Sequence, residues 1–262
     1  MNLLKQLREA TFAPLKDCKD ALLEANGDLD QAQEILKEKG VLKAGKKADR
    51  ETNEGTVKVL QQGDKIVGVK LLCETDFVAK NEGFDSLCDK ILQELLSQDD
   101  VFDSREQAPE SLVNKLDEIV KEAVGSIGEN MKLADIISTK ENGFVYNHPG
   151  NKVASIVFFT GSNVDAAKEI ALQVAAMNPM YLDFDSVPSD IIQKMETEFR
   201  QELIDSGKPE NMIDQILKGK LSKALAEDVL LEQEYIRDGS KKIKNIIPEG
   251  FTLTSYKRFA VK

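Results

Sequence analysis

Apolar residues recur at helical spacing through the first forty residues, with two breaks that predict three short helices. Gly27 ends the second helix because glycine adopts the left-handed C-terminal conformation without strain, and Asp28 can cap the third. We expect the third helix to end at Gly40. The pattern predicts a compact three-helix domain over residues 1–42, followed by a polar linker over residues 43–54. The apolar stripes are formed by Leu3, Leu4 and Leu7, by Leu15, Cys18, Ala21 and Leu22, and by the expected buried face of the third helix, Ala32, Ile35 and Leu36.

Two copies of a hairpin followed by a helix come next. The first opens at Gly55 and the second at Gly143. A lone hairpin is marginally stable, so each is expected to pack an apolar face on its helix. The repeat predicts two related subdomains, and chance similarity between short hairpins is the alternative. The predicted ranges are 55–140 for the first subdomain, and 141–186 with 229–262 for the second, whose C-terminal tail can add an edge strand.

A different pattern occupies residues 187–228. Apolar residues recur every four positions from Ile191 to Leu203, among many charges, and a second narrow stripe follows a Gly-Lys-Pro turn. Two such helices predict an antiparallel coiled-coil hairpin inserted in the core, and two ordinary helices of the main body are the alternative. The elements together place the chain in the α+β class.

Charge narrows the range of partners. The formal net charge is −11, and a nucleic-acid binder needs clustered cations to displace counterions from phosphates. We therefore expect no direct contact with nucleic acid or with an anionic membrane. The chain has three dispersed cysteines without a CxxC pair, which favours a reduced compartment. No signal peptide or apolar span is evident, so the expected location is cytoplasmic.

Candidate chemistry is sparse. The chain has one histidine, His148, and a His/Cys metal site needs three or four ligands. We find no phosphate-binding loop, no dinucleotide fingerprint and no nucleophile elbow. The sequence therefore predicts a protein that is not an enzyme and that uses neither a cofactor nor a metal of its own.

The segment Thr75-Asp76-Phe77-Val78 stands where a buried strand gives way to a helix. In one interpretation, Thr75 or Asp76 caps the helix and Phe77 packs inside. In the other, the acidic–aromatic pair is an exposed probe. Phe77 would then enter an apolar cleft of a partner, and Asp76 would disturb cationic or metal-bound groups there.

Several motifs resemble one known family. The residues Leu7-Arg8-Glu9-Ala10-Thr11, Asp17 to Leu22 and Ala25-Asn26-Gly27-Asp28 look like the N-terminal signature of the elongation factor Ts family. The run Thr75 to Lys80 resembles its second signature, and Ile127 to Asn130 and Leu231 to Gln233 fit further positions. The family releases GDP from elongation factor Tu in bacterial or organellar protein synthesis. The resemblance covers nearly the whole chain.

The resemblance implies a ubiquitin-associated-like helical module, an α+β core in two parts and an inserted coiled coil. It also implies a guanine-nucleotide exchange factor that binds elongation factor Tu in its GDP-bound and nucleotide-free forms. Asp76 and Phe77 would enter the partner near its magnesium and dislodge it. A scaffold or chaperone-like module without exchange activity is the alternative function. The implied partner-binding residues are Lys5, Arg8, Lys19, Thr75, Asp76, Phe77, Val78, His148, Tyr235, Ile236 and Arg237.

Some positions depart from the family pattern. Phe12, Pro14 and Lys16 stand where the family often has Gly, Gly and Met. Tyr235 replaces a common Phe, and two common prolines are Glu234 and Gly239. These departures put residue-level contacts in doubt at both partner-binding ends. The hairpin and the edge of the second sheet also offer surfaces for a homodimer or a two-plus-two complex.

Overall fold

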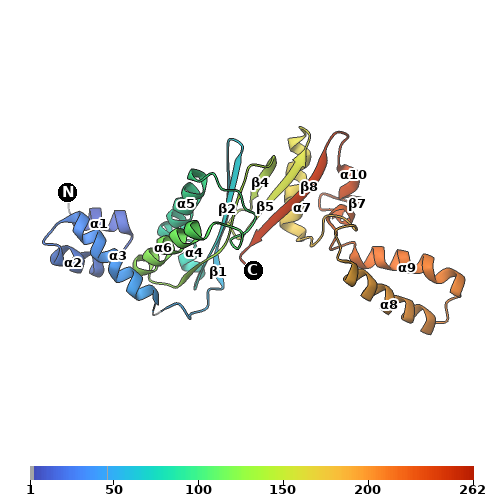
Figure 1. Ribbon diagram of the computed structural model, residues 1–262, viewed down its shortest axis with the longest axis horizontal. Coiled ribbons are helices and arrows are strands. Elements are labelled where there is room, and N and C mark those ends of the chain that lie inside the picture. Colours follow the sequence, from blue (N-terminus) through green and yellow to red (C-terminus); the bar gives the residue numbers. More distant parts are fainter. Residues whose placement is uncertain (1–2, 46) are drawn as a thin grey trace. The chain divides into compact units, whose positions relative to one another are not determined.

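A computed structural model describes residues 3–45 and 47–262. It confirms the α+β class, and the predicted domain boundaries stay a prediction. The chain forms two compact units (Figure 1). Unit 1 comprises residues 1–154 and 259–262, and unit 2 comprises residues 155–258. The chain passes from unit 1 to unit 2 within one strand, β5 (Val153–Thr160), and returns within another, β8 (Thr252–Ala260).

Unit 1 begins with three helices: α1 (Leu3–Thr11), α2 (Leu15–Glu24) and α3 (Leu29–Gly45). We call them the helical module. They enclose a small apolar core formed by most of the predicted stripes, with Leu7, Cys18, Ala21 and Ala32 fully buried. Leu3 and Leu15, which belong to the predicted stripes, are exposed, because each lies at the first residue of its helix. Asp28 accepts a hydrogen bond from the backbone N–H of Gln31 at 2.9 Å, which satisfies one free donor at the start of α3.

The prediction that Gly40 ends the third helix is wrong, because α3 continues to Gly45. Gly40 instead faces α6 (Glu110–Ile127), where the two backbones nearly touch. A Cβ atom on Gly125 would lie 2.0 Å from the Cα of Gly40. Close packing against α6 therefore stabilises α3 through a residue that propensity alone treats as a helix stop. Residues 43–45 of the predicted linker are helical as a result.

The core of unit 1 is an antiparallel sheet of β1 (Glu54–Gln62), β2 (Lys65–Cys73) and β3 (Met131–Thr139), in that order. The helices α5 (Glu82–Ser97) and α6 lie along this sheet (Figure 1). Its apolar residues pack with theirs into one core, which includes Leu71, Phe84 and Leu116. The strand β4 (Gly143–Asn147) adjoins β1, because the Asn147 amide exchanges two hydrogen bonds of 2.9 Å with the Val59 backbone.

In unit 2, β5 and β8 are neighbouring strands, so the C-terminal tail forms the strand that its sequence predicts. The helix α7 (Val164–Met177) follows β5. Four short elements come later: η1 (Leu230–Glu232), β6 (Glu234–Tyr235), β7 (Asp238–Lys242) and α10 (Ile243–Ile246). Within the described ranges, no helix has the length and apolar character that crossing a membrane requires.

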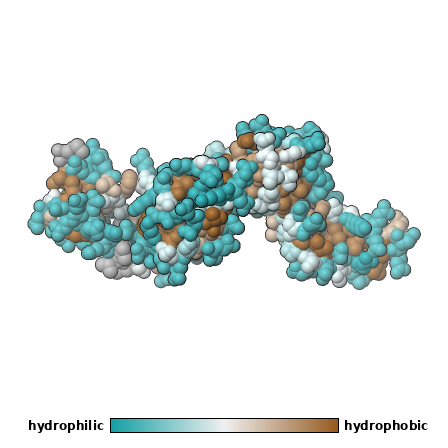
Figure 2. Space-filling model, turned by 45° about the horizontal axis from the view of Figure 1, so that its top comes forward, coloured by the Kyte–Doolittle hydropathy of each residue, from teal (hydrophilic) through white to brown (hydrophobic). Residues whose placement is uncertain are grey.

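The helices α8 (Ser189–Asp205) and α9 (Glu210–Leu225) form a hairpin in unit 2. Gly207 has a φ of 71° in the connecting turn, a conformation that glycine adopts without strain. Leu203, Ile213 and Leu217 are buried between the two helices. Figure 2 shows the same arrangement as an apolar stripe flanked by hydrophilic side chains. The narrow stripe read from the sequence is therefore a helix–helix seam.

Candidate partner-binding site

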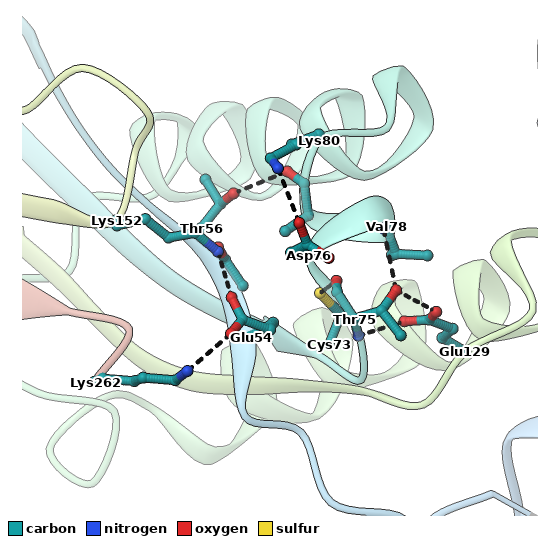
Figure 3. Close-up of polar contacts among 12 residues, drawn as sticks. Glu54, Thr56, Cys73, Thr75, Asp76, Val78, Lys80, Glu129, Lys152 and Lys262 are labelled. Atoms are coloured by element: carbon teal, nitrogen blue, oxygen red, sulfur yellow. Dashed lines mark hydrogen bonds and ion pairs between the residues drawn. The ribbon is translucent and has the colours of Figure 1, made fainter.

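A single helical turn, α4 (Asp76–Ala79), connects β2 to α5 in unit 1 (Figure 3). Thr75 is extended, with φ −126° and ψ 156°, and its hydroxyl accepts a hydrogen bond from the backbone N–H of Val78 at 3.4 Å. Thr75 therefore caps the turn, as one of the two interpretations predicts. We call residues 75–78 the tip.

The same interpretation placed Phe77 inside the protein, and that part is wrong: its side chain is 82% exposed. The core position at this corner is taken by Phe84, which is fully buried. No residue of α4 is buried, and Val78 is the tip side chain that packs against the core of unit 1. Among the large apolar residues that the structure describes, Phe77 is the most exposed.

Hydrogen bonds from the tip to the loop between α6 and β3 fix the backbone of the tip. The Glu129 carboxylate accepts the Thr75 backbone N–H at 2.9 Å and the Thr75 hydroxyl at 2.6 Å. Next to it, the Asn130 backbone N–H donates to the Glu74 carboxylate at 2.6 Å. The Cys73 thiol donates to the Thr75 carbonyl at 3.2 Å. Charge-assisted bonds of this kind are strong, so Phe77 is presented on a backbone with little freedom.

Asp76 carries the charge of the tip. Its carboxylate accepts from the Lys80 ammonium at 2.9 Å, one helical turn away. This hydrogen bond is the main reason that the pKa of Asp76 lies below its usual value, so the group is ionised at neutral pH. An exposed pair of this kind contributes little to stability. A partner can therefore take the Asp76 carboxylate from Lys80 at small cost.

A second charged cluster lies beside α4 and is formed by Glu54, Lys152 and Lys262. Glu54 accepts from the Lys152 ammonium at 2.8 Å and from the Lys262 ammonium at 2.9 Å (Figure 3). These two bonds lower the pKa of Glu54 to about 2. The Thr56 hydroxyl donates to the Ala79 carbonyl at 3.3 Å, which links β1 to the end of α4.

The predicted residues of the helical module are exposed cations. Lys5 and Arg8 lie on α1 and Lys19 lies on α2. Lys5 is 3.6 Å from the Glu9 carboxylate. In the part of the chain that the structure describes, no hydrogen bond or ion pair joins these three side chains to the tip. They are therefore separate from the tip in the contacts that they make.

His148 lies in the turn after β4 and is exposed. Its Nδ1 is 2.9 Å from the Tyr146 hydroxyl, so a tyrosine orients the ring. Two residues of the same turn, Gly150 and Asn151, line a hollow of about 640 Å³ together with Ala79 and Lys80. The turn that carries His148 therefore borders the surface beside the tip.

Tyr235, Ile236 and Arg237 lie in unit 2 and are held by α7. The Glu169 carboxylate accepts from the Tyr235 hydroxyl at 2.6 Å and lies 2.8 Å from Nε of Arg237. This leaves Ile236 between two tethered neighbours with its side chain exposed.

The clamp on this segment is Gln173, whose amide is fully buried. Its nitrogen donates to the Gln233 side-chain oxygen and to the Glu234 carbonyl, both at 3.0 Å. Its oxygen accepts from the Ile236 backbone N–H at 3.0 Å. Sequence reasoning missed Gln173 and Glu169. A polar residue on the otherwise apolar face of α7 was the available signal for Gln173.

Glu129 was also missed as a functional residue, although it belongs to a segment that resembles the family. Its role depends on a contact across 54 residues of sequence, which no local pattern reveals. The exposed acidic–aromatic tip, on a backbone held by hydrogen bonds, is therefore the candidate site for contact with another protein.

Comparison with known proteins shows the family to which this chain belongs. A family model described as "Elongation factor TS" matches residues 74–262. An elongation factor Ts of Hydrogenobaculum sp. is 40% identical over 98% of this chain and 97% of its own length. That of Aquifex aeolicus is 36% identical over 98% and 94%, and that of Halothermothrix orenii 40% over 98% and 90%. The chain belongs to the elongation factor Ts family, which gives it a role in translation elongation.

Proposed function

We propose that this chain is a guanine-nucleotide exchange factor for elongation factor Tu. It binds the GDP-bound partner, promotes loss of GDP and magnesium, and so allows the GTP-bound form to be regenerated. The observation that carries the proposal is Phe77, which stays 82% exposed on a tip whose backbone is fixed by Glu129. Family membership supports the choice of partner, and a cytoplasmic location follows from it as an expectation.

The mechanism is thermodynamic coupling between two sites on the partner. If this chain stabilises the nucleotide-free partner, it must lower the affinity of the partner for GDP. By the same factor, GDP lowers the affinity of the partner for this chain. Burying an aromatic ring contributes about 1.5–3 kcal/mol. Since each factor of ten costs about 1.4 kcal/mol, Phe77 alone accounts for roughly one to two factors of ten.

Asp76 supplies a second contribution. Its carboxylate is ionised and enters beside the partner's bound magnesium, where it competes for the groups that hold the metal. The ion pair with Lys80 orients the Asp76 carboxylate and leaves it exposed to solvent. The exchange factor itself needs no nucleotide site, because its work is to disturb the site of the partner.

The test is the rate at which a fluorescent GDP leaves elongation factor Tu when excess unlabelled GDP is added. We expect this chain to accelerate release, and an Asp76→Ala, Phe77→Ala double variant to lose most of the acceleration. Val101→Ala is the matched control. Val101 is 58% exposed, and its neighbour Phe102 pairs with Ser138 at the end of the sheet opposite the tip. It should leave the rate unchanged.

Two outcomes would overturn different parts of the proposal. If the intact chain binds elongation factor Tu but does not accelerate release, exchange is wrong and the scaffold or chaperone-like function remains. If the double variant is as fast as the intact chain, exchange stands and the assignment of the tip is wrong.

A further inference from the structure

Phe12 has an unusual backbone conformation at the end of α1. Its φ is +54°, in the left-handed region that is unfavourable for a residue with a bulky side chain. The other described non-glycine residues with positive φ are Asn26, Asn151 and Asn178, and asparagine tolerates this region. A phenylalanine here must be held by its surroundings.

The ring of Phe12 packs on Gly83, in the first turn of α5. A Cβ atom on Gly83 would lie 3.1 Å from Cγ of Phe12 and 3.2 Å from its Cβ. The missing side chain of Gly83 therefore makes room for the ring. Gly83 also donates its backbone N–H to the Asn81 side chain at 2.7 Å, directly after α4. Phe12 thus contacts the corner from which the tip projects.

Further contacts hold the helical module on the core. At the crossing of α3 and α6, Gly40 meets Gly125. Beside it, the Lys37 ammonium lies 3.0 Å from the Glu122 carboxylate. After the module, the Asn130 amide donates to the Arg50 carbonyl at 2.7 Å, which fastens part of the predicted linker. The module is therefore docked on unit 1 over several helices.

We propose that Phe12 is a positioning residue for nucleotide exchange, which docks the helical module so that its exposed Arg8 and the tip meet the partner together. The proposal rests on the proposed function. The backbone N–H of Phe12 donates to the Arg8 carbonyl at 2.8 Å, so the ring and the predicted partner-binding Arg8 are one helical turn apart. A partner that must contact both surfaces binds only the docked form.

The expected effect follows from populations. When one form alone binds, the apparent dissociation constant rises in inverse proportion to the population of that form. Phe12→Gly removes the ring and also removes the strain, because glycine adopts positive φ freely. The variant should keep its fold and lose only the docking contact. Gly83→Ala attacks the same contact from the other side, by filling the space of the ring.

The first measurement needs no partner. Spin labels on Lys16→Cys in α2 and Lys121→Cys in α6 report the distance between module and core, since Cys18, Cys73 and Cys88 are buried. We expect one narrow distance distribution in the otherwise intact chain and a broadened one in Phe12→Gly and in Gly83→Ala. A distribution that stays narrow in both variants would overturn the docking role.

The second measurement is the exchange assay. We expect Phe12→Gly to raise the half-saturating concentration by about threefold to tenfold, and to leave the maximal rate of GDP release unchanged. The matched control is Leu15→Ala, another exposed apolar side chain of the module. A Phe12→Gly variant with an unchanged half-saturating concentration would refute the positioning role. If even the intact chain fails to release GDP, the proposed function fails, and the spin-label result still decides the docking.

Discussion

The Glu129 carboxylate accepts both hydrogen bonds that Thr75 can donate, from its backbone N–H at 2.9 Å and from its hydroxyl at 2.6 Å. Thr75 precedes the exposed Asp76–Phe77 pair, so one carboxylate of a distant loop sets the direction of the tip. The relationship makes the tip a preorganised feature of the free protein, and preorganisation lowers the cost of binding.

Replacing Glu129 should therefore loosen the tip without moving Phe77 into the core. We expect Glu129→Gln to lower the free energy of unfolding by about 1–2 kcal/mol, because the two bonds use both carboxylate oxygens and an amide has only one oxygen that can accept. It should also weaken acceleration of GDP release. Glu249→Gln, an exposed carboxylate in unit 2, is the control and should change neither quantity. Wild-type stability and activity in Glu129→Gln would contradict the clamp.

Truncation of two phenylalanines seven positions apart should change the free energy of unfolding by very different amounts. Phe84 is fully buried, so Phe84→Ala should cost about 3–5 kcal/mol of unfolding free energy. Phe77 is mostly exposed, and Phe77→Ala should change it by less than about 0.5 kcal/mol. Denaturant unfolding of both variants measures this. A large loss of stability in Phe77→Ala would show that the ring is buried in solution.

The dependence of stability on acidic pH should reveal how much the Glu54 cluster contributes to the free energy of unfolding. The folded-state pKa of Glu54 is about 2, below the ordinary value of 4.5, because Lys152 and Lys262 donate to the ionised form. Its stabilising effect is therefore fully present above about pH 4.5 and is lost as the pH falls from 4.5 towards 2. Glu54→Gln should show a smaller loss of stability across that window than the intact chain. Equal slopes in the two proteins would disprove this assignment.

A separate prediction concerns Gln173, the clamp in unit 2. Gln173→Leu keeps the approximate volume but removes the partner of the buried Gln233 side-chain oxygen and of the Ile236 backbone N–H. An unsatisfied buried group costs about 1–3 kcal/mol, so we expect a loss of about that size from the Gln233 oxygen. Amide hydrogen exchange at Ile236 should become faster. Gln193→Leu on the hairpin surface is the control. Unchanged protection of Ile236 would mean that β6 and β7 hold the segment alone.

The success of sequence reasoning differed between local and non-local features. The caps at Thr75 and Asp28 and the seam of the hairpin depend on neighbouring residues, so their patterns are visible in the chain. The prediction that the third helix ends at Gly40 was wrong because a glycine can mark either a helix end or a close helix crossing.

The position of Phe77 shows the same limit within the site. Its spacing fits a core residue, and the actual core residue is Phe84 in the next helix. Only the resemblance to a family favoured exposure. The supporting groups, Glu129 and Gln173, act across more than fifty residues, and a single sequence carries no sign of such pairings.

Residues 261 and 262 complete the region beside the tip. The Val261 backbone N–H donates to the Lys152 carbonyl at 3.0 Å, and Lys262 reaches Glu54 across 208 positions. On the ribosome, domains form as their residues emerge, from the N-terminal end onward. The bulk of unit 1 is therefore synthesised about a hundred residues before its final strand residues exist. The surroundings of the tip are therefore completed only after the whole of unit 2 has been synthesised, so a partner would meet an incomplete binding surface on any shorter nascent chain.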